Sequence, residues 1–149
     1  MEAPDTPEQL KARALRYLVQ REHSRAELAR KLAPHAQSPE ALEAVLGLLL
    51  SKRQLSDERF AEERARSLSR KYGAARIRQD LKAKGIDRRI IERISTAGEL
   101  ERASAILQRK YRTPAATREE WARRARFLLG RGFSMETVRQ LLHPAEESA

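Results

Sequence analysis

The sequence contains no cysteine among its 149 residues, which excludes disulfide bonds and thiolate metal sites. It also has no apolar run approaching the roughly 20 residues that a transmembrane helix needs. Its first residues, MEAPDTPEQLK, begin acidic and lack the apolar region of a signal peptide. We therefore expect a soluble, cytoplasmic protein that makes no membrane contact.

Bulky side chains are scarce as well. Aromatic residues make up 5% of the chain and apolar residues 40%, so the interior is expected to consist mostly of Ala, Leu and Ile. Such side chains fill little volume each, which favours several thin cores over one thick core. No convincing alternation of apolar and polar residues, the pattern of a β-strand, is present. The expected fold class is all-α.

Catalytic and metal-binding patterns are also missing. Three histidines, His23, His35 and His143, lie in different turns or tails and never at metal-ligand spacing, so each is expected to be a solvated loop residue. The Gly130-Arg-Gly132 segment lacks the strand and the third glycine of a nucleotide-binding loop, and turn formation explains it better. Because no nucleophile is paired with a base, we expect no enzymatic activity, no cofactor and no metal.

Helix-start signals, by contrast, are abundant. Thr6-Pro-Glu-Gln9, Ser24-Arg-Ala-Glu27 and Thr117-Arg-Glu-Glu120 are capping boxes, and Ser38, Ser56 and Ser134 stand before further helical patterns. These signals and the apolar spacing predict helices over 7–21, 25–32, 39–53, 57–73, 75–84, 87–95, 99–112, 118–131 and 135–142.

A repeat emerges when the turns are aligned. In segments 17–32, 67–81 and 127–142 a leucine precedes the turn, and two apolar residues four positions apart follow it. Chance similarity among leucine-rich helices is one explanation. The physical alternative is a tandem array of helical units, each contacting mainly its neighbours, which suits a composition with little bulk.

Positive charge is spread along these units. The net charge is +10 and the isoelectric point about 10.6, which favours a polyanionic partner. Residues 70–89 carry eight basic against two acidic side chains, residues 109–131 the same, and residues 11–31 seven against two. A GC-rich genome would also enrich arginine, and each cluster alone could be a solvated helix face. Their repetition favours binding.

Some of these charges oppose local helix stability. Arg78 and Lys82 are like-charged neighbours one turn apart, and Arg88 and Arg89 stand in a first helical turn, where positive charge opposes the helix dipole. Local conflicts of this kind are expected at functional positions. The candidate partner-binding residues are Arg70, Lys71, Arg76, Arg78, Lys82, Lys84, Arg88, Arg89, Arg123, Arg124, Arg126 and Arg131.

The middle of the chain contains the segment Leu55-Ser-Asp-Glu-Arg-Phe-Ala-Glu62, which leads into Gly73-Ala-Ala-Arg-Ile-Arg-Gln-Asp-Leu-Lys-Ala-Lys-Gly-Ile86, and Arg131-Gly-Phe-Ser134 follows in a later unit. These motifs resemble those of the RecX family, regulatory proteins of the RecA recombinase. In family order the matches cover roughly residues 12–142. The motif residues, which we interpret as mainly structural, are Asp57, Arg59, Phe60, Ala61, Gly73, Ile77, Leu81, Gly85, Ile86, Gly132 and Phe133. In this interpretation Gly73 and Gly85 are helix ends.

The resemblance implies about three tandem three-helix repeats in an elongated, curved, monomeric array. The repeats would span 7–55, 56–96 and 99–143, followed by a frayed tail at 144–149. The third either lacks a third helix of its own or takes 99–112 as a packing partner. The implied partner is the RecA filament on single-stranded DNA, in whose groove such proteins suppress ATP hydrolysis and strand exchange and limit filament growth or promote disassembly. Roles in homologous recombination, DNA repair and the SOS response would follow.

A second hypothesis stays open, namely a basic helical protein that binds single-stranded or duplex DNA through non-specific phosphate contacts. Against sequence-specific readout, the candidate recognition helices carry only Gln79 and Gln140 as base-reading amides. The scarcity of aromatic residues argues against a dedicated single-strand stacking platform.

Overall fold

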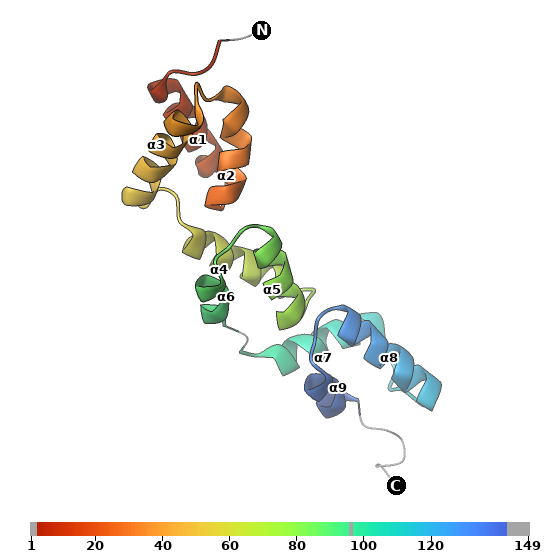
Figure 1. Cartoon of the computed structure of the whole chain (residues 1–149). Coiled ribbons are helices and arrows are strands. Elements are labelled where there is room, and N and C mark those ends of the chain that lie inside the picture. The colour runs from red at the N-terminus through yellow and green to blue at the C-terminus, as the bar shows by residue number, and fades with distance from the viewer. Residues whose placement is uncertain (1–2, 96, 143–149) are drawn as a thin grey trace. The chain divides into compact units, whose positions relative to one another are not determined.

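The computed structural model describes residues 3–95 and 97–142, and this part of the chain is helical, without a strand (Figure 1). The helices are α1 (Pro7–Gln20), α2 (Arg25–Leu32), the short 3-10 helix η1 (Ala33–His35), α3 (Pro39–Ser51), α4 (Asp57–Leu68), α5 (Ala74–Ala83), α6 (Arg88–Arg93), α7 (Glu99–Lys110), α8 (Arg118–Gly130) and α9 (Met135–Leu141). The all-α prediction is confirmed. The predicted tail, together with His143, lies outside the described residues.

The helix starts follow the predicted capping residues. Thr6 completes a capping box with Gln9, because its hydroxyl oxygen accepts the Gln9 N–H at 3.2 Å while the Gln9 side chain accepts the Thr6 N–H at 2.9 Å. Side-chain oxygens also cap α2, α3, α8 and α9, from Ser24, Ser38, Thr117 and Ser134. Each cap satisfies an N–H that the helix itself leaves without a partner.

The end of α4 departs from the prediction. The helix stops at Leu68, and residues 69–72 form a turn in which the Tyr72 N–H donates to the Leu68 carbonyl at 2.9 Å. Gly73 therefore does not end α4. Its carbonyl accepts the Ile77 N–H at 3.1 Å, so Gly73 stands at the N-cap position directly before α5.

The chain forms two compact units. The first comprises Met1–Arg64 and Leu81–Ile94, the second Ala65–Asp80 and Ser95–Ala149, so that α4 and α5 each pass from one unit into the other. Leu, Ala, Val and Ile dominate both cores, as the composition predicts. The first core contains Leu10, Ala14, Leu28, Leu32, Val45, Leu46, Leu49 and Leu55. The second contains Ala103, Ile106, Ala125, Leu128, Phe133, Val138 and Leu142.

In the first unit, the turn between α1 and α2 is held against the start of α4 and the end of α5, at a contact we call the first joint. The Asp57 carboxylate accepts the Arg25 N–H at 2.7 Å, and the Ser24 hydroxyl donates to the Lys84 carbonyl at 3.2 Å. Gly85 has φ +81°, the left-handed conformation that favours glycine. Motif residues Asp57 and Gly85 thus serve the packing of one helical turn on another.

The second unit repeats this construction at a second joint. The Glu99 carboxylate accepts the Ala74 N–H at 3.2 Å, and the Gly73 N–H donates to the Arg131 carbonyl at 2.7 Å. The two turns approach so closely that a Cβ on Gly73 would lie 2.5 Å from the Gly132 carbonyl oxygen. In both joints a carboxylate in the first turn of one helix, Asp57 or Glu99, accepts a backbone N–H from the first residue of another helix, Arg25 or Ala74.

The third helical unit contains α7. Ala103 and Ile106 of α7 share one core with Ala125 and Leu128 of α8 and Val138 of α9. The segment beginning at Glu99 is therefore the first of three helices that pack together. This answers the question left open by the sequence, whether the last unit lacks a helix.

The sequence analysis expected His23 to be a solvated loop residue, and this expectation is wrong. His23 is buried, with only 1% of its surface exposed. Its Nδ1 lies 3.0 Å from the Arg21 carbonyl oxygen and its Nε2 lies 2.9 Å from the Lys31 ammonium. A carbonyl only accepts and an ammonium only donates, so the ring is neutral with its proton on Nδ1. Burial lowers the pKa of His23, consistent with the neutral form.

Candidate functional site

The second unit carries a hollow of about 530 Å³ that we call the basic pocket. Its lining residues are Arg70, Lys71, Tyr72, Ile106, Arg109, Lys110, Phe127 and Arg131. Five of the eight are cations and none is acidic. Within residues 3–95 and 97–142, no ion pair involves any of these five cations. The pocket therefore presents concentrated positive charge that is free to meet an anion.

Aromatic rings hold the cations in place. The Arg131 guanidinium carbon lies 5.4 Å from the Tyr72 ring centroid and 5.1 Å from that of Phe127. The Lys110 ammonium lies 4.3 Å from the Phe127 centroid. Each cation–π contact of this kind contributes about 0.5–1 kcal/mol at an exposed site. The rings thus position charge without neutralising it.

Backbone carbonyls fix the same side chains. Arg131 donates from Nη1 to the Lys71 carbonyl at 3.2 Å, and Arg109 donates from Nη2 to the Arg70 carbonyl at 2.8 Å. Arg76 adjoins the pocket, with its guanidinium carbon 4.9 Å from the Tyr72 centroid and its Nη1 donating to the Gly130 carbonyl at 3.2 Å. Because these long side chains are already ordered, less rotamer entropy is lost when a partner binds.

Sequence reasoning found part of this pocket. Among the candidate residues, Arg70, Lys71 and Arg131 line the pocket, and Arg76 lies beside it. The sequence analysis counted Arg109 and Lys110 in the charge of residues 109–131 but did not choose them as candidates. A signal was present: the tripeptide Arg-Lys-Tyr occurs at 70–72 and again at 109–111, and both copies contribute to this one hollow.

The other candidates are placed differently. Arg78, Lys82, Arg89, Arg123 and Arg126 are exposed on α5, α6 and α8. Lys84 is half-buried. Arg88 pairs with Glu92 at 2.9 Å, and the Asp87 carboxylate caps α6 by accepting the Arg89 N–H at 2.8 Å. The supposed conflict with the helix dipole in α6 is therefore offset by these two acids.

Arg124 is the exception among the candidates, because it is buried, with 8% of its surface exposed. It was expected in an exposed cluster with Arg123 and Arg126. Its position explains the difference, since Trp121, Arg124 and Leu128 follow the three- and four-residue spacing of one helix face, and Leu128 is a core residue.

The family-motif residues lie in the core, in an ion pair or in the two joints. Phe60, Ala61, Ile77, Leu81, Ile86 and Phe133 are buried. Arg59 pairs with Glu22 at 2.9 Å, and Asp57, Gly73, Gly85 and Gly132 take part in the joints described above.

Several cations of the first unit have acidic partners. Asp5 pairs with Arg13 at 2.7 Å, Glu27 with Arg21 at 2.6 Å, and Glu43 with Arg25. Hydrogen bonding to Arg13 lowers the pKa of Asp5, and hydrogen bonding to Arg21 lowers that of Glu27 to about 2. Three basic clusters of similar charge in the sequence thus differ in how much of that charge is neutralised.

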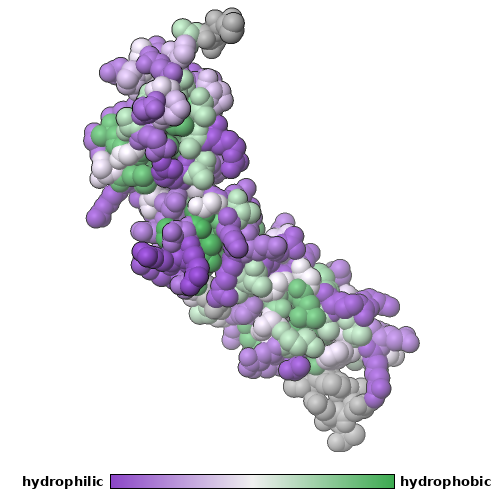
Figure 2. Space-filling model, in the orientation of Figure 1, coloured by the Kyte–Doolittle hydropathy of each residue, from purple (hydrophilic) through white to green (hydrophobic). Residues whose placement is uncertain are grey.

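Figure 2 shows hydrophilic side chains over much of the displayed face of each unit.

Across the described ranges no cluster of three or more metal-ligating side chains occurs, and no helix is long and apolar enough to cross a membrane. Three-helix units joined turn to turn, with a cation-rich pocket whose lining contains no acid, define a helical-repeat protein.

The comparisons with known proteins give the family. Models described as the first, second and third three-helix domains of RecX match residues 11–49, 56–93 and 97–142. The chain belongs to the RecX family, and the resemblance found in the sequence is confirmed. It is 46% identical to a protein named regulatory protein RecX from Herbaspirillum seropedicae over 145 residues, which cover 95% of this chain and 94% of that relative. It is also 46% identical to one of the same name from Leptothrix cholodnii, over 92% of this chain and 89% of the relative.

A solved structure supports the fold. The crystal structure of RecX from Lactobacillus salivarius superposes with a TM-score of 0.79 at 22% identity, covering 91% of this chain and 93% of that one. At that identity the likeness concerns the fold alone.

Proposed function

We propose that this protein is an inhibitor of the RecA recombinase. It binds in the groove of the RecA–single-stranded DNA filament, suppresses ATP hydrolysis and strand exchange, and limits filament growth or promotes disassembly. Family membership supports a regulatory role. A monomeric array of three repeats, bounded as predicted from the sequence, is part of the same proposal.

The observation that carries the proposal is the basic pocket. A nucleoprotein filament is a polyanion, and a surface of uncompensated cations raises both the encounter rate and the affinity for such a partner. In the pocket these cations are held by rings and carbonyls, so that binding does not first have to order them. The exposed arginines and lysines of α5 and α8 would extend the contact.

The test is a titration of the single-strand-dependent ATPase activity of RecA with this protein. We expect inhibition well below one molecule per RecA monomer, because one bound chain that lodges in the groove or blocks filament growth affects several subunits. Absence of any effect, together with tight and salt-sensitive duplex binding, would contradict the proposal.

The same pocket favours a second candidate function, direct non-specific binding of a DNA strand. Cations beside Tyr72 and Phe127 combine phosphate contacts with rings on which bases could stack. A mixed contact to protein and DNA in the filament would use both. If direct DNA binding is the main activity, affinity for oligothymidylate in the absence of RecA falls steeply with salt and is lost when the pocket cations are removed.

A further inference from the structure

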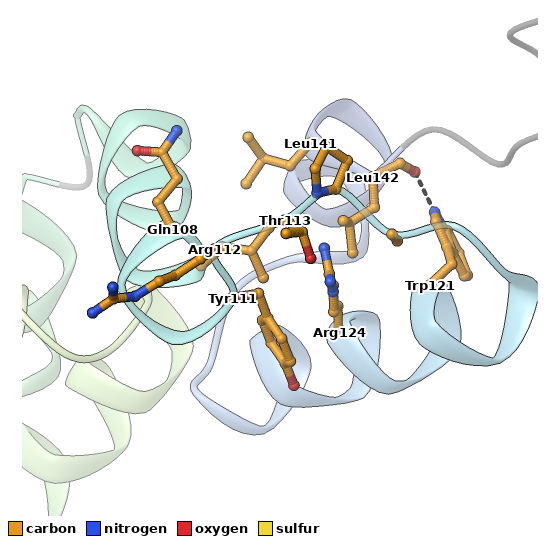
Figure 3. A pocket seen from close by; sticks show the side chains of 11 residues that line it. Gln108, Tyr111, Arg112, Thr113, Trp121, Arg124, Leu141 and Leu142 are labelled. Atoms are coloured by element: carbon orange, nitrogen blue, oxygen red, sulfur yellow. Dashed lines mark hydrogen bonds between the residues drawn. The ribbon is translucent and has the colours of Figure 1, made fainter.

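A second hollow in the second unit contains a side chain whose chemistry the proposed function does not use. This hollow of about 630 Å³ lies where the end of α7, the following connection, α8 and the end of α9 meet, and we call it the Arg124 pocket (Figure 3). The close-up shows Arg124 rising from α8 with Tyr111 on one side and Trp121 on the other, and with its tip toward Thr113 in this view.

Arg124 is more than nine-tenths buried, yet among the described residues it has no hydrogen-bond or ion-pair partner. Its one directed contact is with Tyr111, whose ring centroid lies 4.4 Å from the guanidinium carbon. A guanidinium carries five N–H donors, and burying a charge is costly unless it is paired. Arg124 is one of the residues that line the hollow, so a ligand bound there would meet its side chain.

The surroundings narrow the class of ligand. Arg112 is the other charged lining residue and no acid lines the pocket; Figure 3 shows Arg112 pointing away from Arg124. Leucines, Pro114 and the Trp121 indole form the walls, and the indole is fixed because its Nε1 donates to the Leu142 carbonyl at 2.6 Å. Gln108 and Thr113 add polar side chains to the lining. The site therefore offers one buried fork of donors in an open hollow whose lining is partly polar and partly apolar.

We propose that the Arg124 pocket binds an aspartate or glutamate side chain presented by a partner protein, next to an apolar residue that occupies the leucine-lined wall. Guanidinium and carboxylate form bidentate, charge-assisted hydrogen bonds, which are about twice as strong as neutral ones. A nucleic-acid strand suits this site less, because its evenly spaced phosphates need an exposed track of cations and Arg112, the other cation of the lining, points away from Arg124. The inference does not depend on which polymer the basic pocket meets.

Trp121 provides the measurement, since it is the single tryptophan of the chain and lines the pocket. The full-length protein is titrated with the peptide acetyl-Ala-Leu-Glu-Glu-Leu-Ala-amide, with the same peptide carrying Gln in place of both Glu, with inorganic phosphate and with oligothymidylate. We expect a saturable change of tryptophan fluorescence with the Glu peptide and none of comparable affinity with the others.

Two variants separate binding from folding. Arg124→Met should weaken Glu-peptide binding about tenfold or more, while thermal stability stays the same or rises, because an apolar side chain replaces a buried charge without a partner. Arg124→Lys keeps the positive charge but lacks the guanidinium that forms two parallel hydrogen bonds to a carboxylate. This variant should bind the Glu peptide with an affinity between those of the unaltered protein and Arg124→Met. It keeps the test decisive if the Met variant does not fold. Arg139→Gln removes one exposed charge on α9, outside the pocket, and should leave peptide binding unchanged.

Three results would overturn the inference. Equal binding of the Gln peptide would make the hollow an apolar groove without carboxylate recognition. Oligothymidylate binding that is lost in Arg124→Met would make it a nucleic-acid site. If Glu146→Gln combined with Glu147→Gln increases peptide affinity severalfold, this chain's own acidic residues compete for the pocket and a partner's carboxylate is not its principal occupant.

Discussion

Among single residues of the first unit, Glu27 has a strongly shifted pKa. Its carboxylate lies 2.6 Å from Arg21 and only 16% of its side chain is exposed, with the neutral His23 and Lys31 close by. Hydrogen bonding to Arg21 lowers the pKa of Glu27 from 4.5 to about 2. A carboxyl group whose pKa is lower in the folded than in the unfolded state stabilises the fold above its unfolded pKa. That stability is lost as the pH falls from about 4.5 to about 2.

Glu27→Gln should accordingly lower the free energy of unfolding by about 1–2 kcal/mol at pH 7, a value reduced by solvent screening of the half-exposed Arg21. The difference between the two proteins should disappear by about pH 2. Urea unfolding followed by circular dichroism at several pH values measures it. Glu43→Gln, whose side chain is 61% exposed in its pair with Arg25, should cost less than about 0.5 kcal/mol. A deficit of Glu27→Gln that persists unchanged at pH 2 would show that the lost stability is not electrostatic.

At the scale of elements, the two joints explain why glycines follow certain turns. At Gly73 the obstacle is backbone, since an added Cβ would lie 2.5 Å from the Gly132 carbonyl oxygen and 2.6 Å from the Phe133 nitrogen. Gly132 combines φ +93° with a Cβ position 2.5 Å from that of Arg76. A flexible side chain could move aside, but two hydrogen-bonded turns cannot separate without losing the joint.

Gly73→Ala should therefore lower the free energy of unfolding of the second unit by about 2–4 kcal/mol. Trp121 fluorescence reports this unit specifically. Gly130→Ala is the matched control: it lies two residues from Gly132, nothing approaches within 4 Å of its Cβ position, and its Arg76 contact uses only the carbonyl. Alanine there should be neutral or stabilise by up to about 1 kcal/mol. Equal effects of the two substitutions would mean that close turn packing does not hold the joint.

Helix starts could be predicted and the joints could not, and the difference is one of sequence distance. A cap such as Thr6 or Ser24 acts on an N–H three residues away, so the signal is local. The part played by Gly73 depends on residue 132, which no local pattern reveals. The burial of Arg124 was only partly predictable. Its four-residue spacing to the core residue Leu128 indicated the inward face of the helix, but its charge indicated the surface. His23 was misjudged because its burial depends on Arg21 and Lys31 serving both ring nitrogens.

For the whole molecule, the sequence shows three basic clusters of similar net charge, whereas the structure shows that they are not equivalent. In the first unit, carboxylates pair with Arg13, Arg21, Arg25 and Arg59. In the basic pocket, five cations share one hollow without an acidic lining residue. Because affinity for a polyanion depends on charge that is not already neutralised, the pocket should contribute more to binding than any other cluster.

Paired charge reversals on full-length protein test this ranking. Arg70→Glu with Lys110→Glu alters the basic pocket, Arg78→Glu with Lys82→Glu alters the exposed face of α5, and Arg30→Glu with Lys52→Glu makes the same change of net charge at exposed positions of the first unit. In the RecA ATPase assay the pocket variant should raise the half-inhibiting concentration about tenfold or more, which corresponds to ~1.4 kcal/mol. The α5 variant should raise it by a smaller factor, and the control by no more than about twofold.

Helical circular dichroism should be the same for all three variants, since none of the six side chains is buried. Salt dependence provides the internal check. If a variant loses contacts to a polyanion, its inhibition should depend less steeply on salt concentration than that of the unaltered protein. If only net charge matters, the salt dependence should change by the same amount in all three variants. If the control weakens inhibition as much as the pocket variant, net charge alone governs binding and the basic pocket has no special role. If only the α5 variant does so, the contact surface lies on α5 and the rings of Tyr72 and Phe127 serve the fold rather than the partner.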